Sequence, residues 1–143
     1  EYTKCLEDLD GFSYMWVLSY MHLNEGYKTK IKPLPRQNQA NVPKEVGLFS
    51  SRAPHRPNPI AMSACEIISV DIERAIVEVY GLDLLDDTPI LDIKPYIPAF
   101  DSFPEAKAGW MDSIFEDPLL ARERGYQDIH SSRGRRQANK GVA

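Results

Sequence analysis

Apolar residues occur along this chain in short runs, and polar residues interrupt those runs at regular intervals. The longest apolar run, residues 12–23, predicts a long strand. The segment 74–82 places Ile76, Glu78 and Tyr80 at every second position, which is typical of a strand with one face in water. Further strands are expected over 46–51, 60–70 and 90–93, with a turn at 69–73 that is short enough for a hairpin. Strands at this spacing without long intervening helices favour an antiparallel barrel or sandwich.

Helices and irregular segments are expected outside this strand pattern. Residues 2–9 predict a short helix that ends near Gly11, and residues 28–41 predict a polar, proline-marked connection. Residues 102–115 keep enough apolar side chains to pack, and 118–126 predict a short helix. The sequence therefore predicts a β domain over 1–103, a helical or irregular extension over 104–129, and a basic flexible tail over 130–143.

Length and composition indicate one small globular domain. The 143 residues are enough to bury a core, and the hydrophobic fraction of 43% and charged fraction of 27% are ordinary. We expect no membrane span, because no apolar run is long enough, and no signal sequence is visible. Cys5 and Cys65 lie in apolar surroundings without metal-ligand spacing, so reduced, buried thiols are expected rather than a disulfide. This indicates the cytoplasm, or an organelle if an N-terminal segment has been removed.

The stretch GLFSSRAPHRPNPI, residues 47–60, combines charged side chains with a restrained backbone. Its three prolines fix φ near about −65° and bias the residues before them away from helix. They pre-set the backbone that carries Arg52, His55, Arg56 and Asn58. Because a guanidinium is a rigid planar fork of donors, two of them on a stiff loop indicate recognition of a carboxylate, a phosphate or an adenine edge. The loop is purely structural if its arginines instead pair with acids of the following strands.

A second polar cluster, GLDLLDDTPILDIKPYIP, occupies residues 81–98 and holds Asp83, Asp86, Asp87 and Asp92. Carboxylates this close together can bind a metal, act as general acids or bases, or pair with the arginine loop. The spacing matches neither a calcium loop nor a zinc site, so we expect no metal. The alternative is a solvated turn whose Asp side chains bond nearby amides, and Asp87 suits that role best.

The motifs RxPxRPNPI and DLLDxTPxLDIKPYIP together closely resemble the TsaA/TrmO-like family. Its members are S-adenosylmethionine-dependent methyltransferases that modify the exocyclic amine of a hypermodified adenosine beside the tRNA anticodon. The resemblance extends to LEDLDGFSYMWVLSYMH at 6–22 and KPLPR at 32–36, and covers roughly residues 6–101. It implies a mainly β fold: a small antiparallel β-barrel with peripheral short helices over 1–103, lacking its first strands, and a C-terminal extension. It also implies S-adenosyl-L-methionine as cofactor, tRNA as partner and a homodimer.

The resemblance implies the residues that contact the cofactor: His22, Leu23, Arg52, Met62, Asp86, Asp87, Thr88 and Pro89. Within the DIKPY motif, Asp92, Lys94 and Tyr96 are our candidates for the reaction centre, with Asp92 accepting the amine proton and Tyr96 stacking on adenine or bonding to it. We expect His55, Arg56 and Asn58 to contact the substrate, and Arg56 and Asn58 could instead orient the cofactor. Two alternatives stay open, namely that Tyr96 is a core aromatic and that His22 is an ordinary strand histidine.

The charge distribution fits this picture better than the net charge of −4 does. Residues 25–58 hold seven Lys or Arg against two Glu, whereas residues 59–104 hold nine acids against Arg74 and Lys94. A basic segment beside an acidic one would suit RNA phosphates outside and a sulfonium cofactor inside. Alternatively, the two segments only neutralise one another in the fold, which would give the same charge distribution along the sequence.

Three positions depart from the family pattern. Ala61 and Asp87 stand where glycine is usual, and Tyr14 stands where histidine is usual. Since glycine serves where φ is positive or a ligand approaches the backbone, the first two exchanges would narrow or recharge the cofactor turn. They motivate an alternative function, a catalytically degenerate barrel that serves as a structural or interaction subunit of a larger complex. A third hypothesis is a small-ligand binder that does not methylate.

Overall fold

The fold is described from a computed structural model covering residues 2–33 and 44–112. These residues belong to two compact units, which are described separately. Unit 1 comprises 2–24 and 59–102, and unit 2 comprises 25–33, 44–58 and 103–112. The basic tail expected over 130–143, the helix expected over 118–126 and most of the 104–129 extension lie outside the described residues.

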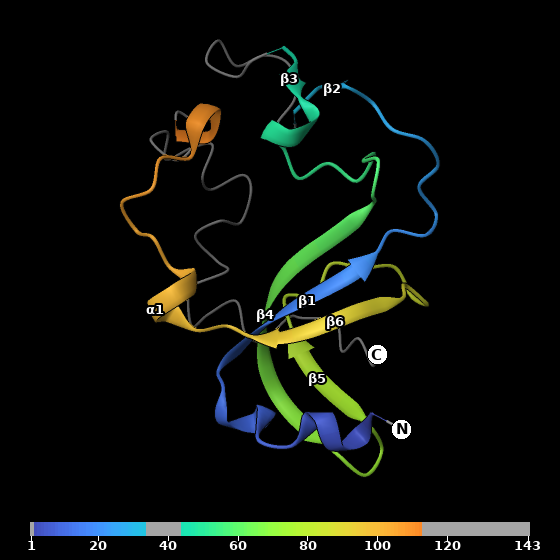
Figure 1. The fold of residues 1–143 in the computed structure, drawn as a ribbon, viewed down its shortest axis with the longest axis vertical. Coiled ribbons are helices and arrows are strands. Elements are labelled where there is room, and N and C mark those ends of the chain that lie inside the picture. Colours follow the sequence, from blue (N-terminus) through green and yellow to red (C-terminus); the bar gives the residue numbers. More distant parts are fainter. Residues whose placement is uncertain (1, 34–43, 113–143) are drawn as a thin grey trace. The chain divides into compact units, whose positions relative to one another are not determined.

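Unit 1 is built on a four-stranded antiparallel sheet in the order β5-β4-β1-β6 (Figure 1). The strands are β1 (Tyr14–Tyr20), β4 (Ile60–Asp71), β5 (Ile76–Tyr80) and β6 (Ile90–Pro95). Short helices flank the sheet: two 3-10 turns at Thr3–Leu6 and Leu9–Gly11, and α1 at Pro98–Asp101. The mainly β, antiparallel fold with peripheral short helices is therefore confirmed.

The residues of β1 alternate between a buried face of the sheet and a more exposed one. Met15, Val17 and Ser19 are buried, whereas the alternate residues are half-buried or exposed. Met15 lies opposite Cys65 of β4, and together with Leu9 these residues form the buried core. Partly buried side chains complete it: Leu6, Ile67, Val70, Val77, Val79, Leu82 and Ile93. We call the opposite side of the sheet, which carries Tyr14, Trp16, Leu18 and Tyr20, the outer face.

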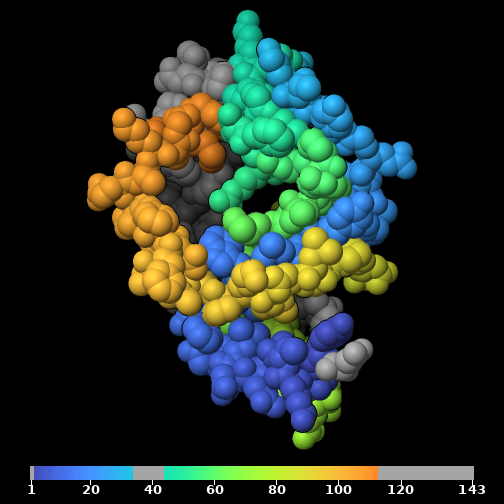
Figure 2. Space-filling model, viewed as in Figure 1, coloured from blue at the N-terminus to red at the C-terminus, as the bar shows by residue number. Residues whose placement is uncertain are grey.

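Two irregularities bend the sheet. One lies in β4 between Ile67 and Ser69, and Figure 1 shows this strand curving along its length. The other lies where β6 meets β1, because Ser19 pairs with Ile90 and Leu18 pairs with Asp92. Leu91 is thus the extra residue of a bulge and is exposed. Figure 2 shows β6, in yellow, lying open on the surface of unit 1.

Unit 2 contains little regular structure among its described residues. A two-stranded antiparallel ladder joins β2 (Lys30–Ile31) to β3 (Val46–Gly47), and 3-10 turns follow at Leu48–Ser50 and Gly109–Met111. Leu48 is buried, and its amide donates to the carbonyl of Thr29 at 3.0 Å. This contact fixes the start of the arginine loop.

Several local expectations were wrong in detail. The strand expected over 46–51 ends at Gly47, because the chain turns into a 3-10 helix that buries Leu48. The helix expected over 2–9 is two 3-10 turns separated by Asp8 at φ 63°. The connection expected over 28–41 includes the short strand β2. Cys5 is exposed rather than buried.

None of the helices in the two described stretches is long and apolar enough to cross a membrane.

The two thiols are expected to differ sharply in reactivity. Cys5 is exposed, whereas Cys65 is fully buried in the core, and burial raises the pKa of its thiol to about 11. Because the thiolate is the reactive form, a water-soluble disulfide reagent should modify only Cys5 in the folded chain and both cysteines in denaturant. The Cys5→Ser variant should then show no fast reaction. Rapid labelling of Cys65 in that folded variant would contradict the packing described above.

Candidate functional site

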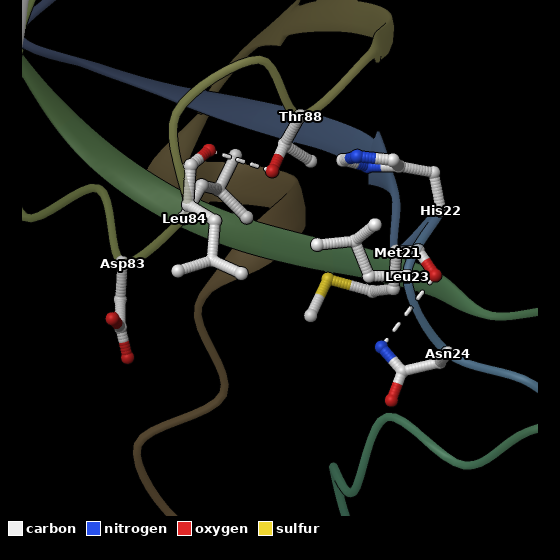
Figure 3. A pocket seen from close by; sticks show the side chains of 8 residues that line it. Met21, His22, Leu23, Asn24, Asp83, Leu84 and Thr88 are labelled. Carbon is white, nitrogen blue, oxygen red and sulfur yellow. Dashed lines mark hydrogen bonds between the residues drawn. The ribbon is translucent and has the colours of Figure 1, made fainter.

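A pocket of about 240 Å³ lies in unit 1 where β1 ends (Figure 3). One wall is formed by the residues that follow β1, and the other by the segment that precedes β6. Leu23 and Leu84 extend into the space between the two walls, whereas the Asp83 carboxylate points away from it. The lining residues are Met21, His22, Leu23, Asn24, Asp83, Leu84, Leu85 and Thr88. Three predicted cofactor contacts, His22, Leu23 and Thr88, are therefore brought together here.

Hydrogen bonds hold the turn of residues 85–89 against the end of β1. The Thr88 hydroxyl donates to the carbonyl of Leu85 at 2.7 Å, and the Tyr20 amide donates to the carbonyl of Pro89 at 2.9 Å. Asp87 has φ 60°, in the left-handed region that favours glycine. Asp86, Asp87 and Pro89 flank Thr88 in this turn but do not line the pocket. The family pattern has glycine at position 87, and this signal in the sequence correctly marked a residue whose φ is positive.

The outer face of the sheet gathers the predicted reaction centre. Asp92 lies opposite Leu18, and Lys94 lies opposite Trp16. The Tyr96 amide donates to the carbonyl of Tyr14 at 2.9 Å, which continues the ladder by one step. Met62, a predicted cofactor contact, lies opposite Leu18 from the β4 side and is 48% exposed. Since directly paired residues of an antiparallel ladder share a face, these groups lie on one surface.

Sequence reasoning missed two aromatic residues of this surface. The Trp16 ring lies 5.5 Å from the Tyr96 ring between centroids, and the Tyr14 ring lies 6.4 Å from the Tyr96 ring in an edge-on arrangement. The signal was present in the alternation of β1, which places Tyr14 and Trp16 on the same side. It became informative only with the register between β1 and β6.

Asp92 is held as a carboxylate by its neighbour. The Lys94 ammonium lies 2.8 Å from Asp92 Oδ2, and this hydrogen bond and the lysine charge lower the pKa of Asp92 below its ordinary value. Both side chains are substantially exposed. The pair therefore presents an ionised carboxylate at neutral pH.

The two arginines of the 47–60 loop differ in their surroundings within unit 2. The Arg56 guanidinium donates from Nη1 to the carbonyls of Ser51 at 3.0 Å, Ala53 at 3.4 Å and Leu48 at 3.5 Å. It also lies 5.4 Å from the centroid of the Phe49 ring. Arg52 is exposed and makes no hydrogen bond or ion pair with any other described residue. Arg56 therefore braces the loop, and Arg52 is the arginine that remains available to a ligand.

The other two predicted substrate contacts are also in unit 2. The carbonyl of His55 accepts a hydrogen bond from the Lys28 amide at 3.3 Å, and Asn58 is exposed. Among the described residues, no group of three or more His, Cys, Asp or Glu side chains is arranged to hold a metal ion.

Trp110 links the 3-10 turn Gly109–Met111 to the loop of residues 47–60, because its indole Nε1 donates to the carbonyl of Ser50 at 2.8 Å. Replacing Trp110 by Phe removes this donor but keeps an aromatic ring. We expect the free energy of unfolding to fall by about 1 kcal/mol, because a hydrogen bond is lost. Proteolytic cleavage after Arg52 should become faster. Chemical denaturation and timed trypsin digestion measure the two effects, with Phe103→Leu, an exposed aromatic in the same unit, as the control. Unchanged cleavage would show that Trp110 does not restrain the loop.

Comparison with known proteins adds a family to this geometry. A model of the tRNA-methyltransferase O N-terminal domain matches residues 1–102. The chain is 43% identical over 99 residues to a mouse tRNA (adenine(37)-N6)-methyltransferase, covering 68% of this chain and 21% of that protein. The enzyme of the same name from Escherichia coli is 36% identical over 115 residues, covering 78% and 47%. A Pyrococcus abyssi protein described as a probable S-adenosyl-L-methionine-binding protein is 34% identical over 125 residues, covering 87% and 64%.

Solved structures give the same relationship. A crystal structure of TrmO from Pseudomonas aeruginosa superimposes with a TM-score of 0.57 at 28% identity, covering 89% of this chain and 54% of that one. A second TrmO crystal structure gives a TM-score of 0.59 at 29% identity, covering 89% and 55%. The chain thus spans about half the length of these solved relatives and about a fifth of the mouse enzyme.

Proposed function

This chain belongs to the tRNA-methyltransferase O N-terminal domain family, and from that membership we propose that it uses S-adenosyl-L-methionine to methylate the exocyclic N6 amine of a hypermodified adenosine 37 in tRNA. The names of the mouse and Escherichia coli relatives support the substrate, and the name of the Pyrococcus relative supports the cofactor. The observation that carries the proposal is the pocket in unit 1, where His22 and Leu23 face Thr88 across a hollow at the end of β1.

The pocket residues fit one part of the cofactor. Its volume of about 240 Å³ lies below the roughly 300–1,000 Å³ usual for a whole ligand. Four of the eight lining residues are leucine or methionine, and the polar ones are Thr88, His22, Asn24 and Asp83. We propose that these residues hold an apolar or ring-bearing portion of the cofactor, and that Met62, Asp86, Asp87, Pro89 and Arg52 contact the remainder. When bound, the cofactor supplies an electrophilic methyl group on a sulfonium.

The reaction then needs an aligned acceptor and a base. An N6 amine that gains a methyl group becomes a strong acid, so even a carboxylate of low pKa can take its proton. Asp92 is such a carboxylate, and the Lys94 contact lowers its pKa. Tyr96 provides an aromatic surface on the same face. We propose that Asp92 accepts the proton while Lys94 and Tyr96 orient the group that it acts on.

Arg52 offers the test of cofactor binding, because it is the loop arginine without a described partner. We expect Arg52→Ala to weaken S-adenosyl-L-methionine binding about tenfold or more, since a hydrogen bond to a charged group contributes roughly 1.5–3 kcal/mol. Isothermal titration measures this affinity. Arg74→Ala is the matched control: Arg74 is 79% exposed, lies in the turn between β4 and β5, and contacts Asp71 at 3.8 Å.

Mass spectrometry of tRNA nucleosides, before and after incubation with the cofactor, tests the activity itself. The proposal expects a gain of one methyl group on adenosine 37. Absence of any methylated nucleoside would contradict the proposed activity.

In the titration, equal cofactor affinities for wild type, Arg52→Ala and Arg74→Ala would exclude Arg52 from the cofactor site.

Four finer features complete the proposal. We propose that the domain extends over residues 1–103, and that its sheet forms part of a barrel; the bends in β4 and at the β1–β6 ladder support this closure. We propose a homodimer, in line with the family resemblance, and a cytoplasmic location, where tRNA is modified. Size-exclusion chromatography with light scattering tests the dimer.

Substrate contacts by His55, Asn58 and Arg56 remain part of the proposal. Arg56 would act indirectly, by bracing the loop that carries the other two residues.

The degenerate-subunit alternative is not favoured. The altered glycines and the missing first strands motivate it, yet Asp87 adopts φ 60°, so the turn keeps the backbone that glycine would give it. Ala61 lies within the regular ladder opposite Ser19, where no positive φ is required.

A further inference from the structure

Trp16 lies on the outer face, opposite Ala64 of β4 and Lys94 of β6. Its strand, β1, runs between these two strands in the sheet (Figure 1). Ala64, the residue opposite Trp16 on β4, has a small side chain and is itself exposed. On the β6 side the Tyr96 ring flanks the Trp16 indole at 5.5 Å, inclined by 58°. The surface therefore carries a large, half-buried aromatic ring that a second aromatic ring flanks on the β6 side.

The polar atom of this ring is unused within the described part of the chain. The Trp16 indole N–H donates to none of the described residues, whereas the indole of Trp110 donates to the carbonyl of Ser50. A partly buried tryptophan usually pairs its N–H. A ring donor without a partner among the described residues is thus a second indication, besides the exposed part of the ring, that this surface receives a ligand.

Charge narrows the kind of ligand. Lys94 is the cation nearest to Trp16 in the ladder, and Asp92 neutralises it at 2.8 Å. Among the described residues of the β1–β6 ladder, a phosphate would meet no unpaired cation, whereas an uncharged planar ring would meet aromatic side chains and a hydrogen-bond donor. Unstacked bases of single-stranded RNA are recognised by such stacking.

We infer that Trp16 is the platform on which an unstacked purine base of the RNA substrate rests, an inference that rests on the proposed function and adds a residue to it. Trp16 is two residues from Leu18, the partner of Asp92, so about 7 Å of strand separates them. A purine stacked on the indole brings its exocyclic amine within reach of the Asp92 carboxylate. Trp16 thus acts as a substrate-positioning residue.

The test uses the full chain and two RNA hairpins. One, the adenosine hairpin, is an anticodon stem-loop that carries the hypermodified adenosine 3′ to the anticodon, and the other carries an abasic residue at that position. We expect the adenosine hairpin to quench tryptophan emission and the abasic hairpin to do so much less. Trp16→Phe should abolish most of this difference, because the two hairpins differ only in the base and Trp16, one of the two tryptophans of the chain, is the one proposed to stack on it.

Kinetics provide the second readout. Trp16→Leu should raise the KM for the adenosine hairpin about tenfold or more, with cofactor affinity unchanged, whereas Trp16→Phe should recover part of the loss. Phe100→Leu is the control, because this phenylalanine is an aromatic of unit 1 that is 72% exposed and lies in α1. Circular dichroism melts confirm that each variant is folded, and the wild-type quenching experiment does not depend on the Leu variant.

The outcomes separate the two levels of the proposal. Methylation by the wild type with unchanged KM in both Trp16 variants would overturn the platform and leave the function intact. Equal quenching by the two hairpins would also overturn the platform. Selective quenching by the adenosine hairpin without methylation would support the platform and overturn the proposed function.

Discussion

Replacing Asp92 by Asn is expected to lower the kcat of methyl transfer about 100-fold or more, while the cofactor dissociation constant changes less than about twofold. The change removes the proton acceptor but keeps the size of the side chain, and positioned acid–base groups contribute roughly 10²–10⁴-fold to rate. Single-turnover transfer from labelled cofactor to tRNA measures the first effect, and isothermal titration measures the second.

Asp71→Asn is the matched control for this variant. Asp71 is also an exposed carboxylate in an ion pair, with Arg74 at 3.8 Å, but it lies at the far end of β4. Its replacement should leave kcat unchanged. A kcat for Asp92→Asn within threefold of the Asp71→Asn value would exclude Asp92 as the proton acceptor.

The pH dependence follows from the same contact. Because Lys94 depresses the pKa of Asp92, the active carboxylate persists above that lowered value and is lost only as the pH falls through it. Asp92 should therefore add no acid limb to the pH–kcat profile above about pH 4. The Lys94→Met variant should shift any acid limb upward, since it removes the hydrogen bond and the charge that lower the pKa.

Replacing Met15 by Ala is expected to lower the free energy of unfolding by about 2–5 kcal/mol, because it leaves a cavity in the buried core. Met15 is 2% exposed and packs with Val17, Leu9 and Cys65. Urea denaturation followed by circular dichroism measures the change. Met62→Ala is the matched control, because the same residue type on the neighbouring strand is 48% exposed. Its loss should stay below about 1 kcal/mol, and equal losses would contradict the assignment of the buried face.

The strands were predictable where their apolar pattern was long enough to set a period. Residues 60–70 and 74–82 were expected as strands and are found as Ile60–Asp71 and Ile76–Tyr80. The 46–51 segment was misassigned because Val46, Leu48 and Phe49 suit a strand and a 3-10 turn equally well. What decides between them is the hydrogen bond from Leu48 to Thr29, a contact that local pattern does not contain.

The sequence predicted the functional residues as a set, but it did not predict the role of each one. The motifs identified both arginines of the loop, yet only the fold distinguishes Arg56, which donates to three loop carbonyls, from Arg52. Trp16 was visible as a strand residue only. Its proximity to Lys94 and Tyr96 depends on the pairing of β1 with β6, which brings together segments far apart in the sequence.

The backbone at Asp87 has a consequence for how this chain could have diverged. Aspartate is one of the few residues with a side chain that tolerates φ 60° without large strain, and a single nucleotide change converts a glycine codon into an aspartate codon. An ancestor could therefore have exchanged the two residues in one mutational step, with the path of the main chain preserved. What such a step alters is the local electrostatic potential, to which a cationic ligand responds and an uncharged one does not.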